Sequence, residues 1–209
     1  MTLDDLDSVV QLHRLCFPVS ISVFSAFSHD IVRRFYAQFV EEAESHAAVL
    51  EEPGSGCIVG VTFGTSKPGF QKRFLKRHRF RLFCSIIKGL LTGMAVWKSL
   101  WARLRKKNSL SLGEYDSVLA EAGVPAPSGL EDLNMGIAVH PDWRGGGNAA
   151  KLIEYYTAII FKTGVVRIRT AILTNNVASM FFFKRCGWKV RKVSDTQVSV
   201  WFDRSGYDS

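Results

Sequence analysis

Several features that would place this sequence in a familiar class of protein are missing from it. No apolar run reaches the length needed to span a bilayer, and no cleavable signal pattern opens the chain. The four cysteines (16, 57, 84 and 186) have neither paired nor metal-type spacing, so we expect reduced thiols, a cytoplasmic location and no bound metal. There are no repeats and no low-complexity linker. With 47% hydrophobic residues, we expect residues 1–209 to form a single domain.

Two nucleotide-binding motifs are also missing. The sequence has no Walker-type lysine pattern, and no two-glycine dinucleotide fingerprint with an acidic ribose partner. These absences argue against nucleotide hydrolysis and against NAD binding.

Acidic residues are missing from one long segment. Between Lys67 and Lys107 there are 13 Lys or Arg residues and no Asp or Glu, whereas the rest of the chain has 14 basic and 19 acidic residues. The net charge of +8 therefore comes from this segment alone. Apolar residues recur in it at helical spacing, so we expect a basic insertion of one or two amphipathic helices at residues 67–113. Three roles stay open for residues 67–107: packing on the core, a lid over an anionic acceptor, and peripheral contact with a membrane.

Hydrophobic periodicity predicts the secondary structure of the remaining chain. Helical spacing predicts helices at 3–16, 29–43 and 114–122, and further helices that begin at Ala149 and Asn176; alternation predicts strands at 47–51, 57–65, 133–139, 165–173, 188–193 and 197–202. We expect Leu15 to face the core from the first helix. In the strand at 133–139, we expect Leu133, Met135, Ile137 and Val139 to share one face.

A glycine-rich turn, Arg-Gly-Gly-Gly-Asn-Ala at 144–149, joins a predicted strand to a predicted helix. Such a turn leaves backbone N–H groups uncovered at the positive end of the helix dipole, an arrangement that binds phosphate. Glycine matters here because a Cβ would hold an anion away from those amides. Glycine-rich turns also serve only as tight corners, so the turn alone leaves both interpretations open.

The residues around this turn resemble the GNAT N-acetyltransferase superfamily. The pattern Arg-x-x-Gly-x-Ala at 144–149 is similar to the superfamily's acyl-CoA pyrophosphate loop. Downstream, Asn-x-x-Ser at 176–179 and Phe-x-x-x-Gly-Trp at 183–188 are similar to its Asn-x-x-Ala/Ser…Tyr-x-x-x-Gly-Phe signature. The resemblance is clear over residues 133–201, weaker over 2–65 and absent between. It implies an α/β (α+β) fold with a mixed, mostly antiparallel sheet flanked by helices, and normally with a strand before the first helix, for which residues 1–2 leave almost no room.

The resemblance implies an enzyme that transfers an acetyl group from acetyl-CoA, its co-substrate, to a primary amine by direct attack. We expect the acceptor to be a small amine, of anionic or sugar type, and we expect no nucleic-acid partner. A protein N-terminus or lysine is an alternative acceptor. A non-catalytic CoA-binding or membrane-surface module is an alternative function.

The resemblance also implies the residues of the site. Those expected to bind the cofactor are Ile137, Ala138, Val139, Arg144, Gly145, Gly146, Gly147, Asn148, Ala149, Asn176, Ser179 and Phe183. Asn176 could also cap its helix. The tyrosine that often protonates the leaving thiolate is replaced by Phe183, which has no proton to give, and Tyr155 or Tyr156 could substitute for it.

Three residues are candidates for the base that removes the amine proton. Glu131 and Asp132 stand just before the predicted strand at 133–139, and His140 follows it. The two acidic residues could equally well be solvent-exposed side chains at the start of the strand, with no catalytic role. His140 could equally well have only a structural role at the corner that precedes the glycine-rich turn.

Overall fold

The order of helices and strands follows the predicted order. The computed structural model describes residues 1–18, 22–91 and 112–207. The helices are α1 (Leu6–Cys16), α2 (His29–Glu41), α3 (Phe70–Leu91), α5 (Leu112–Glu121), α6 (Asn148–Lys162) and α7 (Val177–Arg185), with 3-10 turns η1 (Val23–Ala26), η2 (Pro141–Trp143) and η3 (Arg204–Gly206). The strands are β1 (Ser45–Glu51), β2 (Ile58–Thr65), β3 (Glu131–Val139), β4 (Arg167–Leu173), β5 (Lys189–Lys192) and β6 (Gln197–Asp203). No strand precedes α1 among the described residues.

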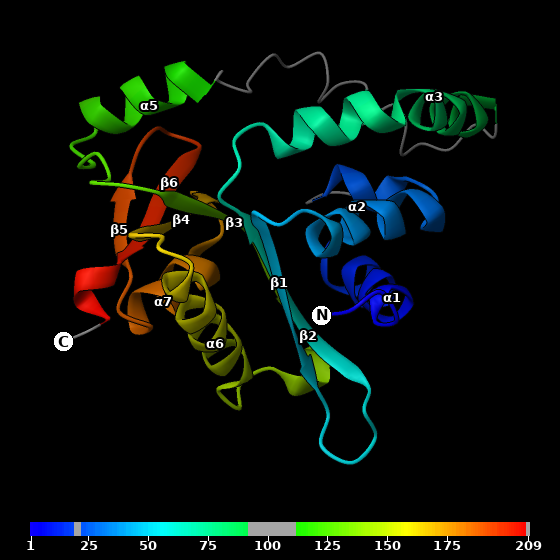
Figure 1. Cartoon of the computed structure of the whole chain (residues 1–209), viewed down its shortest axis with the longest axis horizontal. Helices are drawn as coiled ribbons and strands as arrows, with labels where there is room; N and C mark the ends of the chain where they lie inside the picture. The colour runs from blue at the N-terminus through cyan, green and yellow to red at the C-terminus, as the bar shows by residue number, and fades with distance from the viewer. Residues whose placement is uncertain (19–21, 92–111, 208–209) are drawn as a thin grey trace.

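The strands form one sheet in the order β1-β2-β3-β4-β6-β5. Among the described strands, only the central pair, β3 and β4, is parallel, and every other neighbouring pair is antiparallel. Helices α1 and α2 lie on one side of the sheet, and α6 and α7 lie on the other (Figure 1). The expected class, a mixed and mostly antiparallel sheet flanked by helices, is confirmed.

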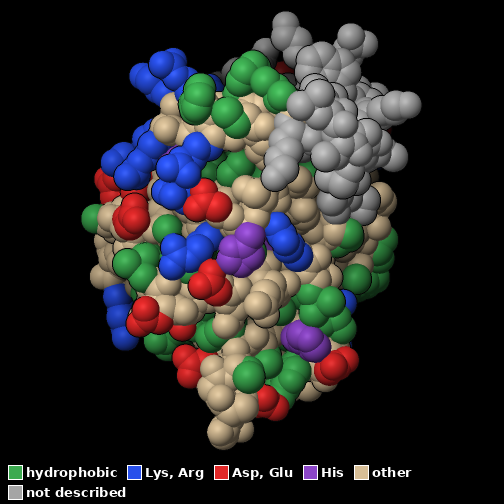
Figure 2. Space-filling view, turned by 90° about the vertical axis from the view of Figure 1, so that its right-hand side faces the viewer, with side chains coloured by type: hydrophobic (Ala, Val, Ile, Leu, Met, Phe, Trp, Pro, Cys, Tyr) green, Lys and Arg blue, Asp and Glu red, His purple; other side chains and the backbone are tan. Residues whose placement is uncertain are grey.

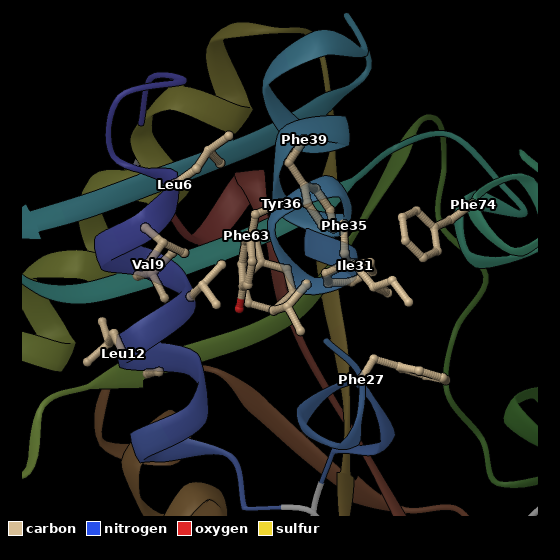
Figure 3. Packing of buried hydrophobic residues seen from close by; sticks show 14 of the residues in the cluster. Leu6, Val9, Leu12, Phe27, Ile31, Phe35, Tyr36, Phe39, Phe63 and Phe74 are labelled. Atoms are coloured by element: carbon tan, nitrogen blue, oxygen red, sulfur yellow. The ribbon is translucent and has the colours of Figure 1, made fainter. Parts of the chain in front are cut away.

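Each face of the sheet has its own hydrophobic cluster. On the first face, α1 and α2 pack on β2 through side chains that include Val9, Phe35 and Phe63, and Figure 3 shows these rings and aliphatic groups converging. On the second face, Ile153 and Ile160 of α6 pack with residues of β4, α7 and β6. The central strands are therefore covered on both sides, and the functional groups of β3 lie between two cores.

A bulge interrupts β3. Phe63 of β2 pairs with Gly136 and the next residue, Gly64, pairs with Asn134, so Met135 is an extra residue without a partner on β2. A bulge of this kind shifts the alternation of side chains by one position.

Two predictions about side-chain direction are wrong. Met135 packs with the cluster on the α1 face, whereas Ile137 packs with the clusters on the α6 face, and Leu133 is 37% exposed, so the four apolar residues of β3 do not share a face. The bulge is the physical reason. Leu15 is 52% exposed, because it lies nine positions after the buried Leu6 and is half a turn out of phase with it.

The described part of the insertion packs on the core. Helix α3 buries Phe70 and Phe74 in the cluster on the α1 face, and the Phe70 ring stacks on Phe39 of α2 at 4.2 Å between centroids. Residues 92–111 of the predicted insertion lie outside the described residues. Within the described ranges, no helix combines the length and apolarity needed to cross a bilayer.

Candidate functional site

The central strands of the sheet separate soon after they begin. β3 and β4 pair only between Glu131–Leu133 and Arg167–Arg169, although β3 continues to Val139 and β4 to Leu173. Beyond that point each strand stays paired with its outer neighbour, so the facing edges have backbone groups without a sheet partner. We call this opening between residues 134–139 and 170–173 the fork.

The glycine-rich turn lies at the open end of the fork, where β3 leads into α6. Gly145 and Gly147 have φ angles of +87° and +80°, in the left-handed region that glycine adopts without strain, and Gly147 caps α6. An added Cβ at either position would meet no atom within 4 Å, so the space beside this turn is open.

The amides of this turn are unpaired. In the described chain, no backbone N–H from Gly145 to Ala150 has a hydrogen-bond acceptor, and the first amide bond of α6 runs from Lys151 to the Gly147 carbonyl at 3.0 Å. Six consecutive N–H donors therefore stand at the N-terminus of a 15-residue helix. This is the arrangement predicted for an anion site.

Arg144 is held at the same end of the fork. Its Nε donates a hydrogen bond to the carbonyl of Val139, the last residue of β3, at 2.9 Å, and its Nη2 lies 3.7 Å from Sγ of Cys16 in α1. Burial raises the pKa of the Cys16 thiol. The guanidinium is thus tied to the ends of β3 and α1, while the residue as a whole stays exposed.

Asn176 caps α7, as predicted. Its side-chain oxygen accepts a hydrogen bond from the backbone N–H of Ser179 at 3.2 Å, and Asn176 is exposed. The cap leaves the Nδ2 group of the same side chain directed to no acceptor in the described chain. One residue can therefore both begin the helix and offer an amide donor.

Phe183 is part of the core on the α6 face. It is 3% exposed, and its ring lies 5.0 Å from Phe182 and 4.9 Å from Trp188 between centroids. Of the two tyrosines considered as substitutes for an acid at this position, Tyr155 is 60% exposed and Tyr156 is buried.

A buried polar group lies where the fork begins. The Tyr156 hydroxyl donates a 2.6 Å hydrogen bond to Oδ1 of Asp132, and Asn134 donates a 2.9 Å bond to the hydroxyl of Thr62. An added Cβ on Gly64 would lie 2.2 Å from the Tyr156 hydroxyl, so glycine at this position lets the tyrosine reach Asp132.

Two oxygens of this group have no donor. Oδ2 of Asp132 and Oδ1 of Asn134 are buried without a hydrogen-bond partner in the described chain. Both are acceptors, and they lie on one face of β3, two residues apart. Buried acceptors of this kind are stabilised by an N–H or O–H donor brought from outside.

Burial controls the protonation of this group. It raises the pKa of Asp132 to about 7, helped by the nearby charge of Glu131 and opposed by the Tyr156 hydrogen bond. Burial and the neighbouring carboxylate raise the pKa of Tyr156 well above its usual value, so the tyrosine keeps its proton. Asp132 is therefore the group that changes charge near neutral pH.

The other two candidate bases have structural partners. Glu131 accepts a 2.9 Å hydrogen bond from Nε of Arg169 on β4. Both residues belong to the short paired segment of β3 and β4 at the closed end of the fork. His140 lies at the corner after β3, where its Nδ1 accepts a 3.3 Å bond from the backbone N–H of Asp142.

The last residues of β3 offer mainly their backbone. Ala138 and Val139 are nearly buried, in clusters on different faces, and Ile137 is partly buried on the α6 face. A ligand in the fork would therefore meet the backbone edge of residues 137–139.

Two parts of this arrangement were not predicted from the sequence. The contact of Cys16 with Arg144 joins residues 128 positions apart, and no local pattern indicates it. The buried polar group had a signal, because Asp132 and Asn134 alternate with Leu133 and Met135, which puts two polar side chains on one face of a central strand.

Comparison with known proteins supports the same fold and superfamily. Residues 120–188 match the model of the Acetyltransferase (GNAT) family. The structure is similar to a PaiA N-acetyltransferase from Thermoplasma acidophilum in complex with coenzyme A, with 8% identity, a TM-score of 0.58, and coverage of 97% of this chain and 95% of that one. No curated protein matches the sequence.

Two further solved structures have the same architecture. The GNAT domain of PAT from S. lividans is 15% identical, with a TM-score of 0.55 and coverage of 97% and 87%. A variant of a spermidine N-acetyltransferase from Vibrio cholerae is 12% identical, with a TM-score of 0.54 and coverage of 100% and 94%. The resemblance to the GNAT superfamily is confirmed, and no subfamily is identified.

Proposed function

We propose that the protein is an acetyl-CoA-dependent N-acetyltransferase that acts on the primary amine of a small acceptor. The GNAT fold and the segment that matches the GNAT family model support this proposal. The observation that carries the proposal is the run of unpaired N–H groups from Gly145 to Ala150. They stand at a helix N-terminus beside an unpaired strand edge, and an added Cβ at Gly145 or Gly147 would meet no atom within 4 Å.

We propose one orientation for acetyl-CoA, with its pyrophosphate at the glycine-rich turn and its acetyl group inside the fork. The pyrophosphate would accept hydrogen bonds from the amides of residues 145–150, with the free part of the Arg144 guanidinium beside it. The pantetheine arm would run along the edge of residues 137–139, within the fork, and the Nδ2 group of Asn176 would donate to it from α7. The acetyl group would then lie towards the closed end of the fork, near the bulge at Met135.

The chemistry needs a neutral amine. In the proposed reaction an acceptor ammonium gives a proton to a base, the amine nitrogen attacks the thioester carbonyl carbon, and the C–S bond breaks to release the CoA thiolate. A backbone N–H on the interrupted strand stabilises the oxyanion that forms in between. The attacking nitrogen must then lose its second proton, and because Phe183 has no proton to give, water carries this second proton from the nitrogen to the thiolate, so that the products are the amide and CoA thiol.

Among the candidate bases, we favour Asp132. Its pKa of about 7 allows it to accept a proton near neutral pH, and Oδ2 is unpaired. Because Asp132 is fully buried, the proton would reach it through a donor that also contacts Oδ1 of Asn134, either the amine itself or one water. Glu131 is already engaged by Arg169.

Titration calorimetry with CoA tests the cofactor site. Replacing Gly146 with Val adds a side chain without backbone strain, since Gly146 has no left-handed φ and its Cβ would make only an ordinary contact. We expect CoA affinity to fall by orders of magnitude, because several charge-assisted hydrogen bonds of about 1.5–3 kcal/mol each are lost. Unchanged affinity in a folded variant would exclude this turn as the pyrophosphate site.

A matched pair of glycines controls for strain. Gly147 and Gly164 stand at opposite ends of α6, both have left-handed φ angles (+80° and +89°), and an added Cβ meets nothing at either. Gly147→Ala should weaken CoA binding, whereas Gly164→Ala should carry the same backbone strain and leave CoA affinity unchanged.

The missing hydroxyl at Phe183 favours an alternative function, a non-catalytic CoA-binding module. An acetyl-transfer assay over a panel of primary amines distinguishes this module from an enzyme. Turnover on any primary amine supports the enzyme, and CoA binding without turnover supports the module. In the active enzyme, the rate should rise with pH through about 7, and Asp132→Asn should remove that rise while CoA affinity is kept. A pH dependence retained in Asp132→Asn would exclude Asp132 as the base.

A further inference from the structure

Helix α3 has apolar side chains on two opposite faces. The inner face buries Phe70, Phe74 and Leu82, at 3%, 0% and 6% exposure. On the outer face, Phe80 and Phe83 are 75% and 59% exposed. Phe83 follows Phe74 by nine residues, which is two and a half helical turns, so the two rings point in opposite directions.

The outer face forms a continuous stripe. Six residues lie along the same side of α3, and each is three or four positions from at least one other member of the set. We call them the outer stripe: Lys72, Lys76, Arg79, Phe80, Phe83 and Ile87. All six are exposed, with Ile87 at 40%. The helix thus already has a packed face, and its second apolar face has no role in the fold of the described chain.

The basic residues of α3 fall into two rows. Three arginines one turn apart pair with acidic residues of α2: Arg73 with Glu42 at 2.9 Å, Arg77 with Glu41 at 3.8 Å and Arg81 with Asp30 at 3.3 Å. The hydrogen bond from Arg34, together with the charge of Arg81, holds the pKa of the Asp30 carboxyl below its usual range. This row is neutralised within the fold.

The basic residues of the outer stripe are not neutralised. Within the described part of the chain, Lys72, Lys76 and Arg79 have no acidic partner. Figure 2 shows Lys and Arg side chains beside exposed hydrophobic ones in the upper part of one face, at the level where Figure 1 places α3. Lower on that face, acidic and basic side chains are interspersed.

We infer that the outer stripe docks on the surface of an anionic lipid bilayer. Aromatic rings and basic side chains on one side of a helix match the headgroup region, where rings enter the acyl boundary and Lys and Arg meet lipid phosphates. A nucleic-acid duplex, whose bases are already stacked, would use the charges and leave exposed Phe80 and Phe83 without a function. A second copy of the chain would bury the rings but would bring two sets of like charges together across a two-fold contact.

Co-sedimentation of the full chain with vesicles tests this inference, which does not depend on acetyl transfer. We expect binding to phosphatidylglycerol vesicles that weakens with salt, and no binding to phosphatidylcholine vesicles. Each basic residue near an anionic surface contributes about fivefold, so replacing Lys72, Lys76 and Arg79 with Gln should weaken binding roughly a hundredfold.

Two matched controls separate the outer stripe from general surface properties. The double variant Phe80→Ser, Phe83→Ser should reduce vesicle binding at least about tenfold without a change in charge. Phe181→Ser removes an equally exposed ring from α7, at 63% exposure, and should leave vesicle binding unchanged. Replacing three exposed basic residues of α6 and α7 with Gln (Lys162, Lys184 and Arg185) should also leave it unchanged.

Four results would overturn the inference. These are no binding to phosphatidylglycerol vesicles, binding that the Phe80 and Phe83 substitutions leave intact, an equal loss in either control, and a dimer in analytical ultracentrifugation that dissociates when both phenylalanines are replaced. An equal loss of vesicle binding in either control would mean that the protein adheres to vesicles through its net charge or its exposed apolar side chains in general. The fourth would assign the stripe to a second copy of the chain.

Discussion

The buried carboxyl of Asp132 should make the protein less stable as the pH rises. Its pKa is raised to about 7 in the folded protein, whereas an Asp in an unfolded chain titrates near about 3.9. The folded state therefore holds this proton more tightly. The contribution of Asp132 to the free energy of unfolding is fully present below about pH 4, falls between pH 4 and 7, and is lost above pH 7.

The size of the effect follows from the shift. A difference of about three pKa units is worth roughly 4 kcal/mol between the two protonation states. Between pH 5 and pH 8, about 2–3 kcal/mol of this should be lost, since some of the change occurs below pH 5. Asp132→Asn keeps an oxygen that can accept the Tyr156 hydrogen bond but has no charge to bury.

Urea unfolding of both proteins at several pH values measures this contribution. We expect the stability of Asp132→Asn relative to the unmodified chain to increase by about 2–3 kcal/mol from pH 5 to pH 8. His13, buried with its pKa lowered to about 4 by burial and by Arg14, destabilises both proteins alike at low pH and cancels in the difference. A difference that stays constant with pH would refute the reasoning, because it would mean that Asp132 is ionised without cost.

Three other substitutions test separate parts of the structure. Phe74→Ala should cost about 3–5 kcal/mol in urea unfolding, because the ring is fully buried between α3 and the α1 face; a cost below 1 kcal/mol would mean that α3 is not packed there. Gly64→Ala should cost at least about 1–3 kcal/mol, since its Cβ would lie 2.2 Å from the Tyr156 hydroxyl and 2.5 Å from the Leu133 carbonyl, and a neutral result in a thermal melt would contradict this packing. Phe183→Tyr should leave the acetyl-transfer rate similar or modestly higher, and a large loss of turnover with unchanged CoA affinity would contradict water as the proton donor.

Much of the fold could be predicted because its elements are strongly periodic. The strand before the glycine-rich turn, the turn itself and the helix after it were predicted in order, and the cap at Asn176 was read from its residue type. These features are local: each depends on residues within a few positions of one another. Apolar spacing and capping chemistry are sufficient to predict them.

The remaining features depend on residues far apart in the chain. The bulge at Met135 is defined by its pairing with β2, so the alternation of β3 alone predicted the wrong face for its apolar residues. The partner of Glu131 is Arg169, and the partner of Asp132 is Tyr156, which was predicted only as a possible substitute acid. Periodicity indicates whether a side chain is buried, but not which polar group it meets.

The short pairing between β3 and β4 has a mechanical consequence for the whole molecule. The sheet consists of two halves, β1-β2-β3 and β4-β6-β5, which are joined directly by only three residue pairs between the described strands. Helix α6 contacts strands of both halves. A ligand bound in the fork would contact both halves of the sheet. Its binding free energy would therefore add to the free energy needed to separate the two halves. Amide exchange along Glu131–Leu133 and Arg167–Arg169 would then slow when a ligand occupies the fork, so the exchange of these paired residues would report binding.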